Sequence, residues 1–147
     1  MRSVKDVEAY LGRLNRQFSQ VEGNGSGAIT FLIHSGKSFP PIALRVDPPL
    51  VLLRVHIGDV TPETSNDLYR KLLSLNAKSL VHTSFGLEDN RIVLGSALEL
   101  ENLDFNELEA TLDEIDLALA QHVPVLAELS GSPGSTRSGA SPQKKKD

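Results

Sequence analysis

The sequence predicts one α+β domain in which helices pack on an antiparallel sheet. Three stretches of the 147-residue chain carry apolar residues at helical spacing, and five shorter runs are rich in β-branched and aromatic residues. The strand-like runs do not alternate with helices, so nothing in the pattern supports a parallel sheet. The predicted order is α-β-β-β-α-β-β-α over residues 1–129, followed by a tail at residues 130–147.

The first helix is predicted to begin at Ser3, which can cap it together with Asp6. Apolar residues then recur at every third or fourth position as far as Val21. We expect the helix to end in segment 23–27, because three of its five residues are glycine. This segment is not a dinucleotide-binding loop, which would follow a strand and precede a helix. The apolar stripe of the helix consists of Val4, Val7, Leu11, Leu14, Phe18 and Val21.

Three strands are predicted next, at residues 28–34, 42–47 and 50–57. Proline cannot donate a hydrogen bond to a central ladder, so the Pro-Pro pair at 48–49 marks the turn between the second and third strands. Residues 50–53 are all apolar, which places apolar side chains on both faces of the sheet. This pattern indicates a central strand, or one that a partner partly covers.

The second helix is predicted to begin at the Thr-Pro-Glu segment 61–63, which offers a hydroxyl cap, a proline at the first position and an acid in the first turn. Asn76 is its expected C-terminal cap. A hairpin should follow, with strands at 80–87 and 91–100 and an acidic turn between them. The apolar stripe of this helix consists of Leu68, Leu72 and Leu75.

The third helix is expected to begin at Asp104, which forms a capping box with Glu107. Its apolar stripe runs on one side and its acids on the other. Pro124 is expected to kink the helix or to end it near Gln121, because proline lacks the N–H that a helix interior needs.

Charge and composition exclude several classes of function. The net charge is −4, of which the tail carries +3, leaving −7 on residues 1–129. No Lys or Arg occurs between Arg91 and Arg137, whereas nine acids do, so this region repels nucleic-acid phosphates. The chain has no cysteine and therefore no disulfide or thiol metal site. We expect no nucleic-acid partner.

The tail is rich in glycine, serine and proline and has no apolar anchor, which predicts disorder. Its terminal lysines are a solubilising run, a contact for an acidic partner or a remnant of cloning. No run of about 20 apolar residues and no signal-peptide pattern occurs in the sequence. We therefore expect a cytoplasmic protein that does not insert into membranes.

A succession of motifs occupies segment 80–126: Phe85-Gly86-Leu87, an acidic turn, Arg91-Ile92-Val93-Leu94, Leu98-Glu99-Leu100, and Leu103-Asp104 before an acidic helix. This succession resembles the second half of the CesT/Tir type III secretion chaperone family and of the related YbjN-type domains. The element order agrees with that resemblance over roughly residues 3–129. The resemblance implies a homodimer that holds an extended segment of a client protein on apolar strips, without ATP and without chemistry.

No residue pattern indicates catalysis or a bound cofactor. Ser84 and Ser96 lie in predicted strands and not in the strand-to-helix elbow of a nucleophilic serine. The acids of the third helix are expected on a solvated face, which leaves their pKa values unraised. Four histidines, no two of them at the helical spacing of a metal-ligand pair, occur at His34, His56, His82 and His122. We expect a non-enzyme with no metal and no cofactor.

Apolar surfaces on the first helix and on the doubly apolar strand are candidates for binding a protein partner, although core packing is the default role of the helix stripe. The predicted partner-binding residues are Val7, Leu11, Leu14, Phe18, Leu50 and Leu52. The first hypothesis is a homodimeric chaperone-like module that binds a client. The alternatives are a YbjN-type regulatory or structural subunit that docks a folded partner, and a small ligand-binding domain with a polar pocket around the histidines.

Overall fold

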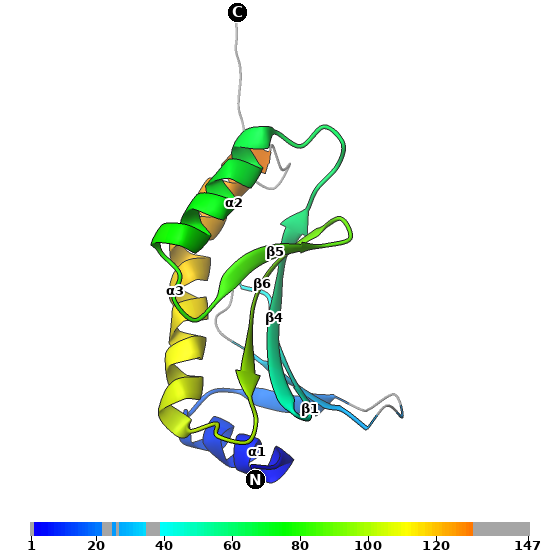
Figure 1. Ribbon diagram of the computed structural model, residues 1–147, viewed down its shortest axis with the longest axis vertical. Coiled ribbons are helices and arrows are strands. Elements are labelled where there is room, and N and C mark those ends of the chain that lie inside the picture. The colour runs from blue at the N-terminus through cyan, green and yellow to red at the C-terminus, as the bar shows by residue number, and fades with distance from the viewer. Residues whose placement is uncertain (1, 22–24, 26, 35–38, 131–147) are drawn as a thin grey trace, which may run out of the picture.

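Six antiparallel strands and three helices make up the computed structural model, which describes residues 2–21, 25, 27–34 and 39–130 (Figure 1). The strand order across the sheet is β1-β2-β3-β4-β6-β5. The predicted α+β class with an antiparallel sheet is confirmed, with one strand more than expected. The elements are α1 (Val4–Arg13), β1 (Phe18–Val21), β2 (Ile29–Ile33), β3 (Ile42–Asp47), β4 (Leu50–Asp59), α2 (Asn66–Lys78), β5 (Ser84–Glu88), β6 (Arg91–Glu99) and α3 (Phe105–Ser130).

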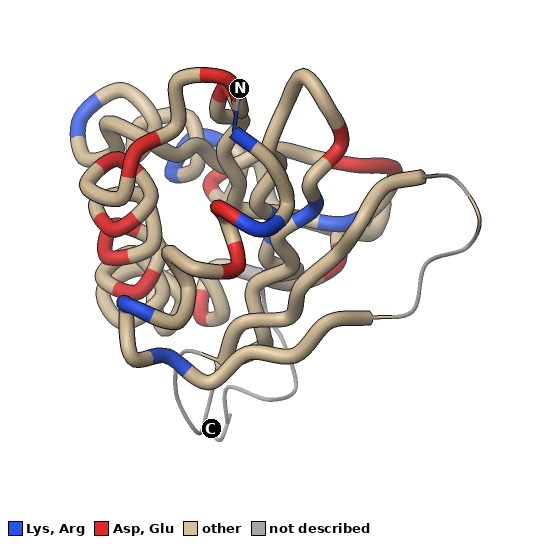
Figure 2. Tube along the Cα trace, turned by 90° about the horizontal axis from the view of Figure 1, so that it is seen from below, with Lys and Arg blue, Asp and Glu red and all other residues tan. Residues whose placement is uncertain are grey.

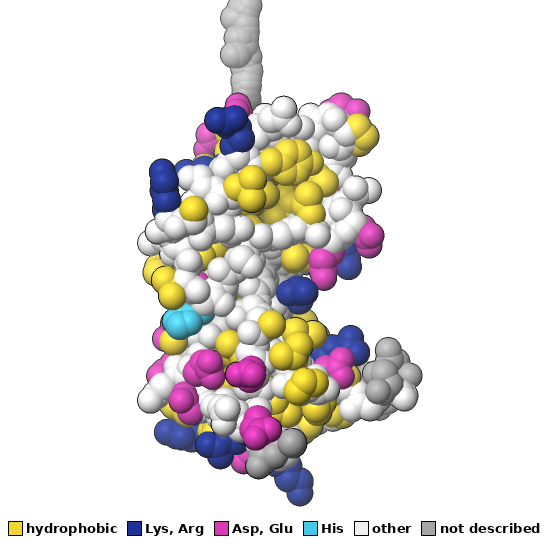
Figure 3. Space-filling view, viewed as in Figure 1, with side chains coloured by type: hydrophobic (Ala, Val, Ile, Leu, Met, Phe, Trp, Pro, Cys, Tyr) yellow, Lys and Arg dark blue, Asp and Glu magenta, His cyan; other side chains and the backbone are white. Residues whose placement is uncertain are grey.

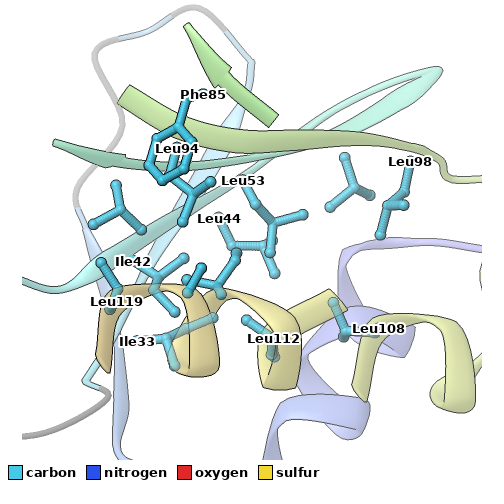
Figure 4. Close-up of a cluster of buried hydrophobic side chains, with 14 of the residues drawn as sticks. Ile33, Ile42, Leu44, Leu53, Phe85, Leu94, Leu98, Leu108, Leu112 and Leu119 are labelled. Atoms are coloured by element: carbon cyan, nitrogen blue, oxygen red, sulfur yellow. The ribbon is translucent and has the colours of Figure 1, made fainter. Parts of the chain in front are cut away.

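The core lies between one face of the sheet and the helices, and we call this face the helix side. Alternate residues of each strand point to it, because successive side chains of a strand point to opposite faces. Figure 4 shows apolar side chains of the strands directed toward α3, whose leucines meet them. The buried set includes Ile33, Ile42, Leu44, Leu53 and Leu94 from the strands and Leu108, Leu112 and Leu119 from α3.

The first helix is shorter than its apolar stripe predicts, and this accounts for the extra strand. α1 ends at Arg13, and Asn15 then takes a positive φ of 60° that turns the chain out of the helix. Phe18 and Val21 belong to β1, which pairs with β2. The ring of Phe18 packs edge-on against Phe31 with centroids 5.9 Å apart. Pairing with a distant strand therefore overrides the local helical pattern.

β4 lies in the middle of the sheet between β3 and β6, so the central position expected for the doubly apolar strand is confirmed. The strand predicted at 42–47 and the turn at the Pro-Pro pair 48–49 are also confirmed. The hairpin of β5 and β6 has its predicted turn, in which Asp89 takes a φ of 56°.

α2 begins later than the Thr-Pro-Glu segment predicts. The backbone N–H of Thr61 donates to the Thr64 hydroxyl at 2.8 Å, which closes a separate turn before the helix. The hydroxyl of Ser65 then accepts from the Asp67 N–H at 3.0 Å and caps the helix. The helix continues past Asn76 to Lys78, so Asn76 is not its C-terminal cap.

α3 begins as predicted and extends further than predicted. The Asp104 carboxylate accepts from the Glu107 N–H at 2.7 Å, which confirms the cap. The helix does not end near Gln121 but continues through Pro124 to Ser130. Leu126, which lies beyond the proline, is 3% exposed in the core, and its burial favours continuation despite the missing backbone bond. The predicted tail begins at the last helical residue, and its residues 131–147 lie outside the described part of the chain.

Gly95 in β6 allows two neighbours to approach closely. A Cβ atom at this position would lie 2.5 Å from the Leu53 carbonyl oxygen and 2.7 Å from Nη1 of Arg54. Arg54 stands opposite Gly95 in the register and reaches past it to Glu88 on β5, with Nε 3.3 Å from the carboxylate. The absence of a side chain at Gly95 therefore permits this ion pair to cross β6.

We predict that Gly95→Ala destabilises the fold by about 1–3 kcal/mol, because the methyl group forces a backbone carbonyl aside. Gly86→Ala is the matched control, since a Cβ there would meet nothing within 4 Å and Gly86 is also a strand glycine. Urea unfolding of the two variants and the wild type measures the difference. Equal stability of the two variants would contradict the close approach at Gly95.

Candidate protein-binding surface

The six residues predicted to bind a partner lie in two separate places. Val7 and Leu11 are fully buried between α1 and the rest of the core. Leu14 and Phe18 are half-buried and pack on the same core. Leu50 is 38% exposed and Leu52 is half-buried, and both point to the outer face of the sheet, opposite the helix side. Contact between these residues and a partner stays a prediction.

β1 forms one edge of the sheet, and its register with β2 shows which of its backbone groups point away from the sheet. The N–H of His34 donates to the Gln17 carbonyl at 2.9 Å, across the same register that pairs β1 with β2. Hydrogen-bonded and non-bonded pairs alternate along an antiparallel ladder. The N–H and C=O groups of Phe18 and Gln20 therefore point away from β2. No other strand of the described chain pairs with β1 on that side.

At the opposite edge, β5, a side chain occupies the backbone groups of one residue, Phe85. The amide of Asn76 on α2 donates to the Phe85 carbonyl at 3.0 Å and accepts from the Phe85 N–H at 2.7 Å. One side chain thus occupies both outward backbone groups of Phe85, as a neighbouring strand would. An incoming strand cannot use that part of β5, and the two edges of the sheet differ in their availability.

An apolar hollow lies between α2, the segment that joins β4 to α2, and β5. Figure 3 shows hydrophobic side chains gathered there, above β5 in the same view as Figure 1. Leu87 pairs with Ile92 and shares the helix side of β5 with the buried Phe85, yet it is 49% exposed. Apolar surface of this kind is common where proteins contact one another.

Two acids of α3, Asp113 and Asp116, are engaged by Arg16 of the N-terminal segment. Figure 2 shows several Asp and Glu positions, in red, along α3, with others elsewhere on the molecule. Arg16, whose side chain is 14% exposed, lies 2.7 Å from Asp116 and 3.3 Å from Asp113. The Arg13 guanidinium stacks over the Phe105 ring at 3.9 Å. The expected fully solvated acidic face is therefore incorrect at Asp116, which helps to fasten the N-terminal segment to α3.

Glu114 holds the connection between α2 and β5. Its carboxylate accepts hydrogen bonds from the N–H groups of Val81, His82 and Thr83 and from the Thr83 hydroxyl. Burial opposes the charged form of Glu114, but these hydrogen bonds outweigh it and hold its pKa below the ordinary value of 4.5. The sequence carried no signal for this contact, because it joins residues about thirty positions apart.

The histidines do not converge on one site. His34, His56 and His82 are exposed on different segments, and His56 contacts Asp59 at 3.0 Å. Burial, followed by the nearby charge of Lys71, lowers the pKa of His122 below its ordinary value of 6.5. Within the described ranges, no three His, Asp or Glu side chains gather as a metal ion would require.

The model of the CesT_Tir_1 family matches residues 1–132. The chain belongs to the CesT_Tir_1 family. The resemblance seen in the β5–β6–α3 segment is thereby confirmed, and it extends over nearly the whole chain.

Solved structures agree with the family in fold. A chain of the heterodimeric ExoU–SpcU complex from the type III secretion system of Pseudomonas aeruginosa superposes with a TM-score of 0.64 and 18% identity, covering 83% of this chain and 98% of that one. YbjN from E. coli gives a TM-score of 0.55 and 14% identity, with 86% and 91% covered. The HopA1–SchA chaperone–effector complex gives 0.50 and 13%, with 84% and 89% covered.

No curated protein matches this CesT_Tir_1 chain. In the part of the chain that the structure describes, none of the helices has the length and apolar character needed to cross a membrane.

We predict that Asn76→Ala destabilises the protein by about 1–3 kcal/mol, because both outward groups of Phe85 lose their partner. Asn106→Ala is the control, since Asn106 is exposed on the first turn of α3. Urea unfolding measures stability, and sedimentation reports whether the uncovered β5 edge promotes self-association. Matching stabilities of the two variants would contradict the clamp.

We predict that Glu114→Gln removes a pH-dependent part of the stability. The folded-state pKa of Glu114 is lowered, so its contribution is present above the unfolded value near 4.5 and is lost as pH falls through the folded pKa. The variant should be less stable than the wild type at pH 7, by about 1–2 kcal/mol. The gap should narrow in acid, as measured by urea unfolding between pH 3 and pH 7. Glu109→Gln on the same helix serves as control, and a gap independent of pH would refute the assignment.

Proposed function

We propose that this chain is a non-catalytic cytoplasmic chaperone that holds an extended segment of a client protein, and that the segment adds as a strand to the β1 edge. The observation that carries the proposal is the difference between the two sheet edges. The backbone groups of Phe18 and Gln20 point outward at β1, whereas Asn76 occupies those of Phe85 at β5. Backbone hydrogen bonds to an edge bind an extended chain with little regard to its sequence, and side-chain contacts add selectivity.

Apolar side chains on both faces support this position. A strand placed beside β1 would direct alternate residues to the helix side, next to Phe18 and Leu14, and to the outer face, next to Val21. Val21 is 38% exposed at the edge itself, whereas Leu50 and Leu52 lie on the same outer face but on β4, with Thr30 and Arg45 in register between Val21 and Leu52. Val7 and Leu11 are buried, so their part is to seat α1 on the core beside the edge.

Family membership supports the chaperone class. One structure of similar fold is a chaperone–effector complex, and another is a heterodimeric complex of a type III secretion system. Because these chains are less than 20% identical to this one, the client itself follows from neither.

We further propose that the protein is a homodimer and that the apolar hollow beside α2 contributes to its interface. The exposed Leu87 and the hydrophobic surface in Figure 3 favour a protein contact there. A second copy at this place would leave the β1 edge open, since β5 and β1 lie at opposite ends of the strand order.

A YbjN-type regulatory or structural subunit is the second candidate function. It is favoured by the similarity to YbjN, at a TM-score of 0.55 over 86% of this chain. Such a subunit would dock a folded partner and would leave the β1 edge unpaired.

We predict that Gln20→Pro abolishes client binding and preserves the fold. Proline removes the outward N–H of Gln20, which none of the described strands uses, and edge positions tolerate proline. Affinity isolation of the tagged full-length protein from its own cells, followed by mass spectrometry, detects the bound client. Gln20→Thr keeps the N–H and suits a strand, so it should retain the client.

Hydrogen exchange of the isolated complex separates the two candidate functions. Strand addition protects the amides of Phe18 and Gln20. Retention of the client by Gln20→Pro, or protection only at other surfaces, would refute strand addition and favour the YbjN-type alternative.

A further inference from the structure

The outer face of α3, directed away from the core, exposes apolar side chains along its C-terminal half. Leu117 is 56% exposed and Val125 is 41% exposed. Ala120 and Pro124 are exposed on the same face. Leu117, Ala120 and Pro124 are three and four residues apart, which places them together on one side of the helix, and Val125 stands about 80° around the helix from Leu117. We call this surface the outer strip of α3.

Val81 extends the outer strip from the neighbouring connection. Its side chain is 83% exposed, although its backbone is firmly held. The N–H of Val81 donates to Glu114, and the Ser96 hydroxyl donates to the adjoining His82 carbonyl at 2.8 Å. Leu117 stands one turn beyond Glu114 on α3, so Val81 and Leu117 flank the same carboxylate. An exposed apolar side chain on a fixed backbone loses little entropy when a partner covers it.

The outer strip has an acid at each end, one of which, Asp113, pairs with Arg16. Asp113, one turn before Leu117, has a side chain that is 69% exposed even while it contacts Arg16. Glu128 is exposed one turn beyond Pro124 and Val125. The last turn of α3 contains no basic residue, so the negative end of the helix dipole is uncompensated by the helix itself.

Pro124 adds a hydrogen-bond acceptor to the outer strip. Proline has no N–H, so the Ala120 carbonyl does not receive the regular helical bond from position 124. A donor from outside the helix can serve this oxygen.

We infer that the outer strip of α3, together with Val81, binds a basic amphipathic segment of a partner protein. Apolar residues of that segment would cover Leu117 and Val125, and its Lys or Arg side chains would meet Asp113, Glu128 and the end of the helix. A second copy of this chain is disfavoured, because two α3 helices would bring their carboxylates together. This surface carries no part of the β1 edge, so the inference stands apart from the proposed client site.

The test uses the full-length protein and a fluorescently labelled 14-residue helical peptide of leucine and lysine, with a leucine–glutamate peptide of the same pattern as its counterpart. Fluorescence anisotropy measures binding. The basic peptide should bind, the acidic one should not, and added salt should weaken the binding.

Replacing the two most exposed apolar side chains of this surface, by Val81→Gln with Leu117→Gln, should weaken binding of the basic peptide by about tenfold or more. Leu73→Gln is the control. Leu73 is 69% exposed on α2. Lys71 of the same helix lies near His122 of α3, and Leu73 is two positions further, about 200° around the helix, so it points away from α3. The control should bind as the wild type does. All three replaced side chains are exposed, and urea unfolding checks that each variant keeps the wild-type fold.

Three results would overturn the inference. One is equal binding of the basic and acidic peptides, or binding of neither. Another is unchanged affinity in the Val81 and Leu117 double variant. The third is a dimer in sedimentation that this double variant converts to monomer, because a second copy would then occupy the outer strip. Loss of the client by Gln20→Pro with peptide binding intact would separate this surface from the proposed client site.

Discussion

The packing of α3 across the helix side of the sheet is the contact on which the rest of the structure depends. Leu108, Leu112 and Ile115 are fully buried in the core. Burial of each such side chain contributes about 1.5–3 kcal/mol to the free energy of unfolding. The same helix anchors two other parts of the chain by charge. Asp116 holds Arg16 near α1, and Glu114 holds the connection that leads into β5. A single helix thus determines where the N-terminal segment and the last hairpin can lie.

This arrangement leaves the sheet with unlike edges. α2 lies beside β5, where Asn76 hydrogen-bonds to the backbone of Phe85. α2 also contacts α3, and β5 pairs with β6, which α3 contacts. At the other end of the sheet, β1 has a neighbour on one side only. An unprotected edge is a hazard for most proteins because it pairs with other chains. In a protein that holds extended segments of others, the same property is useful, and the contact of Asn76 with Phe85 removes one pairing position from β5.

Some carboxylates of α3 have partners within the protein, and others face the solvent. Arg16 pairs with Asp113 and Asp116 of α3, and backbone N–H groups of the connection before β5 donate to Glu114. The remaining carboxylates lie outward, on a surface that also exposes Leu117 and Val125. Apolar area between acidic ends selects a partner by both shape and charge, which neither property does alone.

The sequence by itself determined the fold class, most of the strands and the start of α3, because these depend on short-range patterns: alternation in β3, the doubly apolar run of β4 and the Asp104 cap. It also determined the absence of thiol chemistry and the acidic C-terminal half. Only the tertiary structure decided that Phe18 and Val21 form a strand, that α3 passes through Pro124, and that Val7 and Leu11 are core. Each of these outcomes depends on burial or pairing against residues far along the chain. The contacts of Asn76 and Glu114 depend in the same way on distant backbone groups, whose positions no local pattern reveals.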